Sequence, residues 1–404
     1  MIPAAPADSY TRARRIELIA LFGLLTCFTP IGIDLYLPAL PTVAREFHAP
    51  IAAIEHSLAT FFLGLAVGQA VVGPLSDRFG RRMPIIAGLA LYVVGSAGCA
   101  LAQGPLMLDV ARFVQACGSC AGTVLARACV RDLFRPSEAA RIFAQMLLIL
   151  SVSPLFAPFV GGWMLVITGW RSLFWLQAAA AILTLALVWL QLPESHPGSD
   201  RRLHPLHVLK DYWIIGRDRN FFGYIVPAIL SGAGLYVFLT GWPHVVIDVY
   251  HIAPQYFGFT FVLNGVGLIV FSQGTARWLK NHPGEPLFFA CLVSNAISGV
   301  LAMVFGWLDW GGLVGLLPWT FVYCSMIGSI NATGSGLAMH HYGHAAGMAS
   351  ALIGIFLYGG GTLASALMGA FVTPTTPVPL TGLMALFGVG GVTTYLLFRP
   401  RPAG

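Results

Sequence analysis

Long apolar stretches alternate with short polar ones along the whole chain. Each apolar stretch runs for about 20 residues or more, the length that a helix needs to cross a ~30 Å hydrocarbon core. Backbone groups in lipid need partners within their own segment, so these stretches predict helices; a β-barrel would show short alternating strands instead. The twelve stretches are 16–37, 54–75, 83–103, 106–127, 142–167, 172–192, 221–246, 256–276, 287–308, 311–337, 345–371 and 378–398.

The composition agrees with this pattern. Of 404 residues, 57% are hydrophobic and only 9% are charged, whereas a soluble domain has about a quarter of its residues charged. The chain is therefore predicted to be an all-α integral membrane protein. Basic residues before the first stretch resemble a signal peptide, but that stretch is long enough to span and is not followed by a small-residue cleavage site, so we expect a retained helix.

The distribution of Lys and Arg predicts how the chain is oriented. Eighteen of these cations lie on the side that holds both termini, and only Arg45 and Arg171 lie on the other. By the positive-inside rule, both the N-terminus and the C-terminus are expected in the cytoplasm. The net charge of +6 is then a topology signal, and no nucleic-acid partner is expected.

The longest polar stretch divides the predicted helices into two groups of six. We expect an N-terminal six-helix bundle at 1–192, a cytoplasmic linker at 193–220 and a C-terminal six-helix bundle at 221–404. Transporters built this way hold their substrate near the midplane between two repeats. The seven cysteines lie in or beside apolar stretches, and neither a P-loop nor an H-E-x-x-H sequence occurs. No disulfide framework, cofactor or metal is therefore expected.

The loop between the second and third stretches carries the strongest motif. GPLSDRFGRR, residues 73–82, resembles the signature loop of the major facilitator superfamily, G-x-L-a-D-R-x-G-R-[KR]. Its glycines allow a tight turn, and Asp77 can meet the positive N-terminal end of a helix from the other half and close the cytoplasmic side. An ordinary basic loop is the alternative. The predicted conformational gate comprises Asp77, Arg78, Gly80 and Arg81, with Arg127 or Arg131 as a rival partner for Asp77.

Two further motifs lie in the fourth and fifth stretches. ARFVQACGSCAG (111–122) resembles the span-4 pattern R-x-x-Q-G-x-G, although Ala116 replaces its first glycine. SVSPLFAPFVGGWML (151–165) resembles the span-5 antiporter motif. Prolines weaken a helix and small residues let a neighbour approach closely, so the second motif predicts a bendable seam; a kinked helix without a role in transport direction is the alternative. Its expected residues are Pro154, Pro158, Gly161 and Gly162.

These motifs, together with IDLYLPALP (33–41) and GWRSLFW (169–175), make the chain resemble the Bcr/CflA drug-resistance branch of the major facilitator superfamily. The resemblance implies a proton-coupled multidrug exporter of the bacterial inner membrane that works by alternating access, and not an enzyme. Its expected partners are a small-molecule substrate, protons and the lipid bilayer, and we expect a monomer. A dedicated exporter of one metabolite, such as a siderophore or nucleoside, is the alternative.

Asp34 is the natural candidate for proton coupling because it lies in the first apolar stretch. An ionised carboxylate there costs at least ~2.5 kcal/mol. Removal from water favours the protonated form of a carboxyl group, so a proton and a substrate can compete for it, which is antiport. Arg112 is expected at a similar depth as its partner. The alternatives are an Asp34 that snorkels or caps backbone at the outer boundary, and a purely structural pair. Embedded charges are expected only in the first and fourth stretches.

Uncharged polar and aromatic residues in the apolar stretches are candidates for substrate contact. Ordinary packing or an interhelical hydrogen bond is the alternative for each of them. An intramembrane enzyme would need a nucleophile and a base together at membrane depth, and the sequence offers no such pair. The candidate substrate contacts are Tyr36, Gln115, Tyr236, Trp242, Asn264, Asn331 and Tyr358.

Overall fold

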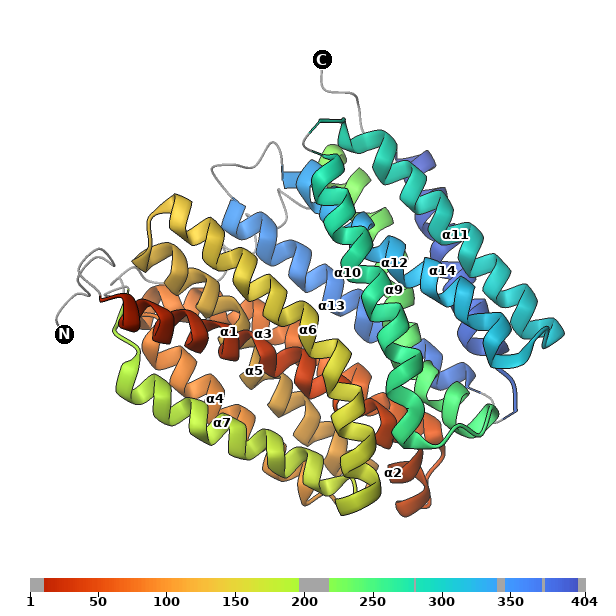
Figure 1. Cartoon of the computed structure of the whole chain (residues 1–404), viewed down its shortest axis with the longest axis horizontal. Helices are drawn as coiled ribbons and strands as arrows, with labels where there is room; N and C mark the ends of the chain where they lie inside the picture. The colour runs from red at the N-terminus through yellow and green to blue at the C-terminus, as the bar shows by residue number, and fades with distance from the viewer. Residues whose placement is uncertain (1–10, 196–217, 280, 340–345, 373–374, 399–404) are drawn as a thin grey trace. The chain divides into compact units, whose positions relative to one another are not determined.

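The protein is seen here in a computed structural model that describes residues 11–195, 218–279, 281–339, 346–372 and 375–398. The side chains of residue 12, of several residues between 136 and 154, and of residues 346–351 are not described. Each predicted apolar stretch corresponds to one long helix (Figure 1). These are α1 (Arg12–Asp34), α3 (Ile51–Phe79), α4 (Arg82–Ala100), α5 (Pro105–Leu133), α6 (Pro136–Thr168), α7 (Arg171–Gln191), α9 (Arg219–His244), α10 (Phe257–Trp278), α11 (Gly284–Leu308), α12 (Gly312–Met339), α13 (Ala346–Phe371) and α14 (Val378–Leu397).

The described residues form helices and turns, with no strand among them. Eleven helices in this part are long and apolar enough to cross a membrane, and a shorter apolar helical segment, Leu155–Thr168, lies in α6. Large apolar side chains cover much of the exposed surface, including Leu190 at 79% and Trp307 at 75% exposure. Such a surface suits hydrocarbon and not water. The prediction of an all-α integral membrane protein is confirmed.

The chain forms two compact units. The first comprises residues 1–47 and 60–203, and the second comprises 48–59 and 204–404. The boundary at 203/204 falls inside the predicted linker 193–220, of which residues 196–217 lie outside the described part. Residues 48–59 group with the second unit although they precede the linker by more than a hundred residues. Helix α3 therefore contributes its first nine residues to one unit and the rest to the other.

The two units repeat the same internal packing. In the first unit, α1 packs against α5 and α6, while α4 packs against α5 and α7. In the second, α9 packs against α12 and α13, while α11 packs against α12 and α14. These helices hold equivalent places in the two groups of six, so the shared packing supports an internal repeat of the kind found in many membrane transporters.

Helix α1 ends at Asp34, three residues earlier than the apolar pattern predicted. Pro38 is the reason: it has no N–H to bond the carbonyl of the residue four positions earlier, which is Asp34, and its ring crowds that carbonyl. The chain continues as a short 3₁₀ turn (η2, Leu37–Ala39) and a short helix (α2, Leu40–Glu46). Asp34 is thus the last residue of a helix, where sequence analysis placed it inside one.

Candidate proton and substrate sites

Asp34 is buried without a partner. Its side chain is 4% exposed, and in the part of the chain that the structure describes it makes neither a hydrogen bond nor an ion pair. The C-terminal end of a helix carries partial negative charge, so the end of α1 also disfavours an ionised carboxylate. Gly161 of α6 packs against Leu35, the residue that follows Asp34, because a Cβ added to Gly161 would overlap the carbonyl oxygen of Leu35. The predicted antiporter motif therefore packs beside the candidate proton carrier.

Arg112 lies fully buried in α5. Its Nη1 donates to the carbonyl of Gly32 at 2.8 Å and to Oε1 of Gln115 at 2.6 Å. Aromatic faces attract a guanidinium and offset part of the cost of its burial. Three rings lie around the Arg112 Cζ, with centroid distances of 4.1 Å to Phe61, 5.0 Å to Tyr36 and 5.8 Å to Phe174.

The expected pair between Asp34 and Arg112 is not formed. Among the described residues no salt bridge within 4.0 Å joins them, and Arg112 bonds instead to the backbone of Gly32, two residues before Asp34. The carbonyl of Gly32 and the aromatic rings occupy the space around the guanidinium. Nε and Nη2 of Arg112 have no hydrogen-bond partner within the described ranges. Each of the two buried charges is therefore left uncompensated by the other, which marks both as functional candidates.

Gln115 extends this cluster into a polar network between α4, α5 and α7. Its Nε2 donates to Oγ of Ser96 at 2.8 Å and to Oε1 of Gln177 at 2.9 Å, and the hydroxyl of Tyr92 donates to the same Gln177 oxygen at 2.8 Å. Sequence analysis missed Ser96, Tyr92 and Gln177, although a polar residue within an apolar stretch is the signal that would have found them. Gln115 and Tyr36 are both fully buried, and their contact with substrate stays a prediction.

The signature loop holds the predicted gate residues in a charge network. Oδ1 of Asp77 pairs with Nη1 of Arg81 at 2.8 Å, and Nε of Arg81 pairs with Oδ2 of Asp132 at 3.0 Å. Partial burial lowers the pKa of Arg81, but hydrogen bonds and charge interactions with Asp132 and Asp77 outweigh it and leave that pKa above its ordinary value. Glu194 accepts from the backbone N–H of Arg81 at 2.7 Å and of Arg82 at 3.2 Å. Sequence analysis missed Asp132 and Glu194.

The remaining gate residues occupy the same end of the unit. Gly80 has a φ of +82°, a conformation that a glycine adopts without strain, so it makes the tight turn before α4. The Arg78 guanidinium lies 5.1 Å from the ring of Phe79. Nε of Arg127 donates to the carbonyl of Thr123 at 3.2 Å, and Arg131 is exposed in the last turn of α5. Closure of Asp77 onto a helix of the other half stays a prediction.

The span-5 motif lies in α6, which is one helix from Pro136 to Thr168. Pro158, Gly161 and Gly162 are buried, whereas the side chain of Pro154 lies outside the described residues. The close approach of Gly161 to α1 is the seam that small residues permit. Its bending stays a prediction.

In the second unit the candidate substrate contacts fall into two groups. Tyr236 and Tyr358 lie side by side, with ring centroids 6.4 Å apart. Separately, Nε1 of Trp242 donates to Oγ1 of Thr260 at 3.2 Å, and Nδ2 of Asn264 donates to the Thr260 carbonyl at 2.8 Å. Trp242 is fully buried, while Oδ1 of Asn264 is buried and has no hydrogen-bond partner among the residues that the structure describes.

Asn331 lies near the pair of Tyr236 and Tyr358, because it is close to Gly232 on α9. Its Oδ1 lies 3.7 Å from the position that a Cβ on Gly232 would take, one turn before Tyr236. Ring faces and an amide on α9, α12 and α13 can contact an apolar ring and orient a polar group on it.

A buried acid that sequence analysis missed lies in α3. Glu55 is 0% exposed, and neither carboxyl oxygen has a hydrogen-bond partner in the part of the chain that is described. The expectation that embedded charges occur only in the first and fourth stretches is therefore wrong. The second apolar stretch was predicted to begin at residue 54, which made Glu55 a boundary residue, whereas α3 begins at Ile51 and carries Glu55 into its second turn.

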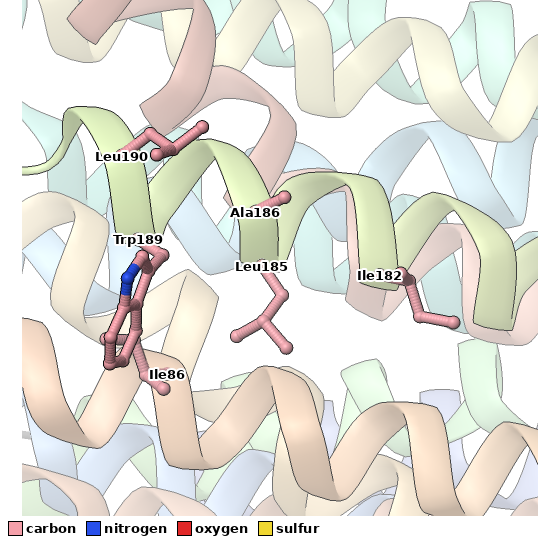
Figure 2. A pocket seen from close by; sticks show the side chains of 6 residues that line it. All are labelled: Ile86, Ile182, Leu185, Ala186, Trp189 and Leu190. Carbon is pink, nitrogen blue, oxygen red and sulfur yellow. The ribbon is translucent and has the colours of Figure 1, made fainter.

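An apolar hollow of about 480 Å³ lies between α4 and α7. Figure 2 shows its lining side chains, which include the ring of Trp189 and come from both helices. Ligand sites combine an apolar lining with a few polar groups that fix orientation. The side chains of this lining offer only the indole N–H of Trp189, so the hollow suits a lipid chain better than a transported substrate. It is lined by Ile86, Ile182, Leu185, Ala186, Trp189 and Leu190.

Comparison with known proteins agrees with this architecture. The family model of the Major Facilitator Superfamily matches residues 22–365. The chain is 32% identical to the "Uncharacterized MFS-type transporter YdgK" of Bacillus subtilis, over 94% of this chain and 95% of that one. It is 27% identical to the "Bicyclomycin resistance protein homolog" of Haemophilus influenzae (95% and 96%) and 25% identical to "Multidrug resistance protein D" of Escherichia coli (96% and 98%).

Solved structures show the same fold at low identity. The crystal structure of a D-xylose–proton symporter superposes with a TM-score of 0.72 at 18% identity, covering 97% of this chain and 98% of that one. The nucleoside transporter NupG superposes with a TM-score of 0.74 at 13% identity, covering 95% and 98%. The twelve helices, the signature loop and the family match agree, and the chain belongs to the Major Facilitator Superfamily, in its Bcr/CflA-type drug-resistance branch.

Proposed function

We propose that this transporter exports small drug-like compounds from the cytoplasm in exchange for protons, with Asp34 as the proton carrier. The observation that carries the proposal is the burial of Asp34 at the end of α1 without a hydrogen bond or ion pair among the described residues. Such a group is stable when protonated and costly when ionised. It is therefore suited to take up a proton on one side and to release it when its surroundings open to the other.

Arg112 has a separate role in this proposal. Its guanidinium is held by Gly32 and by aromatic rings, so it fixes the backbone just before Asp34 and keeps a positive charge in the first unit. A rearrangement that brought Arg112 towards Asp34 would stabilise the ionised carboxylate and favour proton release. A cationic substrate would act in the same way, which couples substrate binding to proton loss.

The class of substrate is proposed from the names of relatives. They include a bicyclomycin resistance protein homolog, a chloramphenicol resistance protein and multidrug resistance proteins. Tyr236, Tyr358 and Asn331 supply ring faces and an amide without a formal charge, a combination that suits small, largely apolar molecules. The distribution of cations supports cytoplasmic termini and a bacterial inner membrane.

The test uses host cells that lack their own drug exporters. Expression of the protein should raise the tolerated concentration of bicyclomycin or chloramphenicol, and everted membrane vesicles should accumulate the compound only while a proton gradient exists. Collapse of that gradient with a protonophore should abolish accumulation. Unchanged susceptibility across a broad drug panel, together with gradient-driven transport of one siderophore or nucleoside, would replace drug efflux with the dedicated-exporter alternative.

A further inference from the structure

The buried acid in α3 has no role in the function proposed so far. Glu55 lies in residues 48–59, which belong to the second unit, whereas Asp34 belongs to the first. Its side chain is completely buried, and both carboxyl oxygens lack a partner in the described part of the chain. Isolated ionised carboxylates are among the most costly groups to bury, and the effective cost is several kcal/mol. A proton or a cation must therefore neutralise the negative charge of the Glu55 carboxylate.

The surroundings of Glu55 make this cost larger. The Asp248 carboxylate, in the short π-helical segment η3 (Val245–Val249) that follows α9, lies close enough to act on the charge of Glu55, and it is also negative. Two neighbouring carboxylates resist being ionised together. Asp248 is itself paired, through Oδ2, with Nδ1 of His244 at 2.9 Å. Nδ1 of His244 is therefore directed to Asp248, whereas neither carboxyl oxygen of Glu55 has a hydrogen-bond partner among the described residues.

Helix α13 covers the same turn of α3. A Cβ added to Gly369 would lie 3.3 Å from the ring of His56 and 3.4 Å from the carbonyl of Ala52. The α13 sequence from 346 to 371 has no Asp, Glu, Lys, Arg or His. Among the described residues, the titratable groups found near this turn are thus Asp248 in η3, with His244 paired to it, and the exposed His56 on α3 itself. None of the groups on α13 can neutralise Glu55.

We propose that Glu55 is a second proton-binding site of this transporter, reached from water through Asp248. In the state described, the proton resides on Glu55 and makes its carboxyl group neutral. Asp248 is 32% exposed on its side chain, so it connects the buried acid with solvent. When η3 and α13 move away from α3, water reaches Glu55, its O–H bond breaks and the proton passes to water or to Asp248. The step needs no other reactant.

This inference rests on the proposed function only for its role in coupling, because the proton site itself can be measured without any transport. Infrared spectroscopy of the purified protein in lipid nanodiscs detects the C=O stretch of protonated carboxyl groups. We expect a band that disappears with rising pH and is lost in Glu55→Gln, which keeps the shape of the side chain and cannot ionise. The same band should persist in Asp34→Asn, because a protonated Asp34 contributes a band of its own. Glu138→Gln, at a partly exposed ion pair with Arg15, is the matched control and should retain the band.

Asp248→Asn provides a second, directional test. It removes the neighbouring negative charge that opposes ionisation of Glu55, so the band should disappear at lower pH than in the wild-type protein. In addition, a hydrophobic carbodiimide, which modifies protonated carboxyl groups in apolar surroundings, should label the peptide that contains Glu55 in the wild-type chain. That labelling requires no variant and remains informative if Glu55→Gln fails to fold.

Two outcomes would overturn the proposal. The first is an unchanged infrared band in Glu55→Gln together with no labelling of Glu55, since Glu55 would then be ionised. The second is loss of the band on addition of sodium at constant pH, which would identify a cation site. Failure of the proposed function looks different: gradient-driven efflux would survive in Asp34→Asn while Glu55 still titrated.

Discussion

Gly161→Ala should destabilise the protein although alanine is the better helix former. The added Cβ would overlap the carbonyl oxygen of Leu35 and lie 3.1 Å from its carbon and 3.2 Å from Cγ of Pro38. A backbone carbonyl cannot rotate away as a side chain can, so α1 and α6 must separate. Overpacking of this kind costs about 1–3 kcal/mol, and the exchange of glycine for alanine within a helix returns about 1 kcal/mol. Because the overlap is with a backbone carbonyl, we expect the upper part of that overpacking range, about 2–3 kcal/mol, and hence a net loss of about 1–2 kcal/mol.

The measurement is thermal unfolding of the purified protein in detergent. At about 2–4 °C per kcal/mol for a unit of this size, Gly161→Ala should lower Tm by a few degrees. Gly359→Ala is the matched control, because it also lies within an apolar helix but an added Cβ there meets nothing within 4 Å; its Tm should stay the same or rise. Equal Tm values for both variants and the wild type would refute the close contact between α6 and the end of α1.

Three further predictions concern the loop and the topology. Asp77→Asn removes an exposed ion pair with Arg81, so it should change Tm by little. It should nevertheless slow transport in reconstituted vesicles while substrate binding persists, and an unchanged transport rate would argue against a gate. Glu194→Gln leaves the backbone N–H of Arg81 or Arg82 without its carboxylate acceptor. It should lower the free energy of unfolding by about 1–2 kcal/mol, visible as a lower Tm, whereas an equal Tm would contradict these hydrogen bonds. Reporter fusions near residue 200 should report cytoplasm and those near residue 170 the opposite side; a reversed pattern would undo the predicted orientation.

Much of the fold follows from apolar patterning alone. In lipid a helix satisfies every backbone group within its own segment, so a long apolar stretch determines both the type and the approximate length of an element. That is why all twelve helices were predicted within six residues of their observed ends. The exceptions have local causes. Pro38 ends α1 at Asp34, and Glu55 and His56 interrupt the apolar pattern near the true start of α3, where Glu55 is buried in protein and not exposed to lipid.

The sites were less predictable because a sequence indicates how deep in the membrane a residue lies but not in which direction its side chain points. Asp34 and Arg112 were correctly expected to be embedded, and both are buried. Their pairing was inferred from equal depth, yet Arg112 faces the carbonyl of Gly32 and the aromatic rings. The loop network shows the same limit: Glu194, more than a hundred residues from Arg81, completes it. The motifs identified the loop and the helices that carry the candidate residues, and only the packing shows which side chains meet.

Proton-driven efflux by Asp34→Asn in proteoliposomes tests the central proposal most directly. Asparagine keeps the size of the side chain and cannot ionise, so it resembles an aspartate that never releases its proton. The account predicts that the variant folds, retains substrate binding without the wild-type dependence on pH, and loses efflux driven by an imposed pH gradient. Robust gradient-driven efflux by Asp34→Asn would contradict the assignment of Asp34 as the proton carrier.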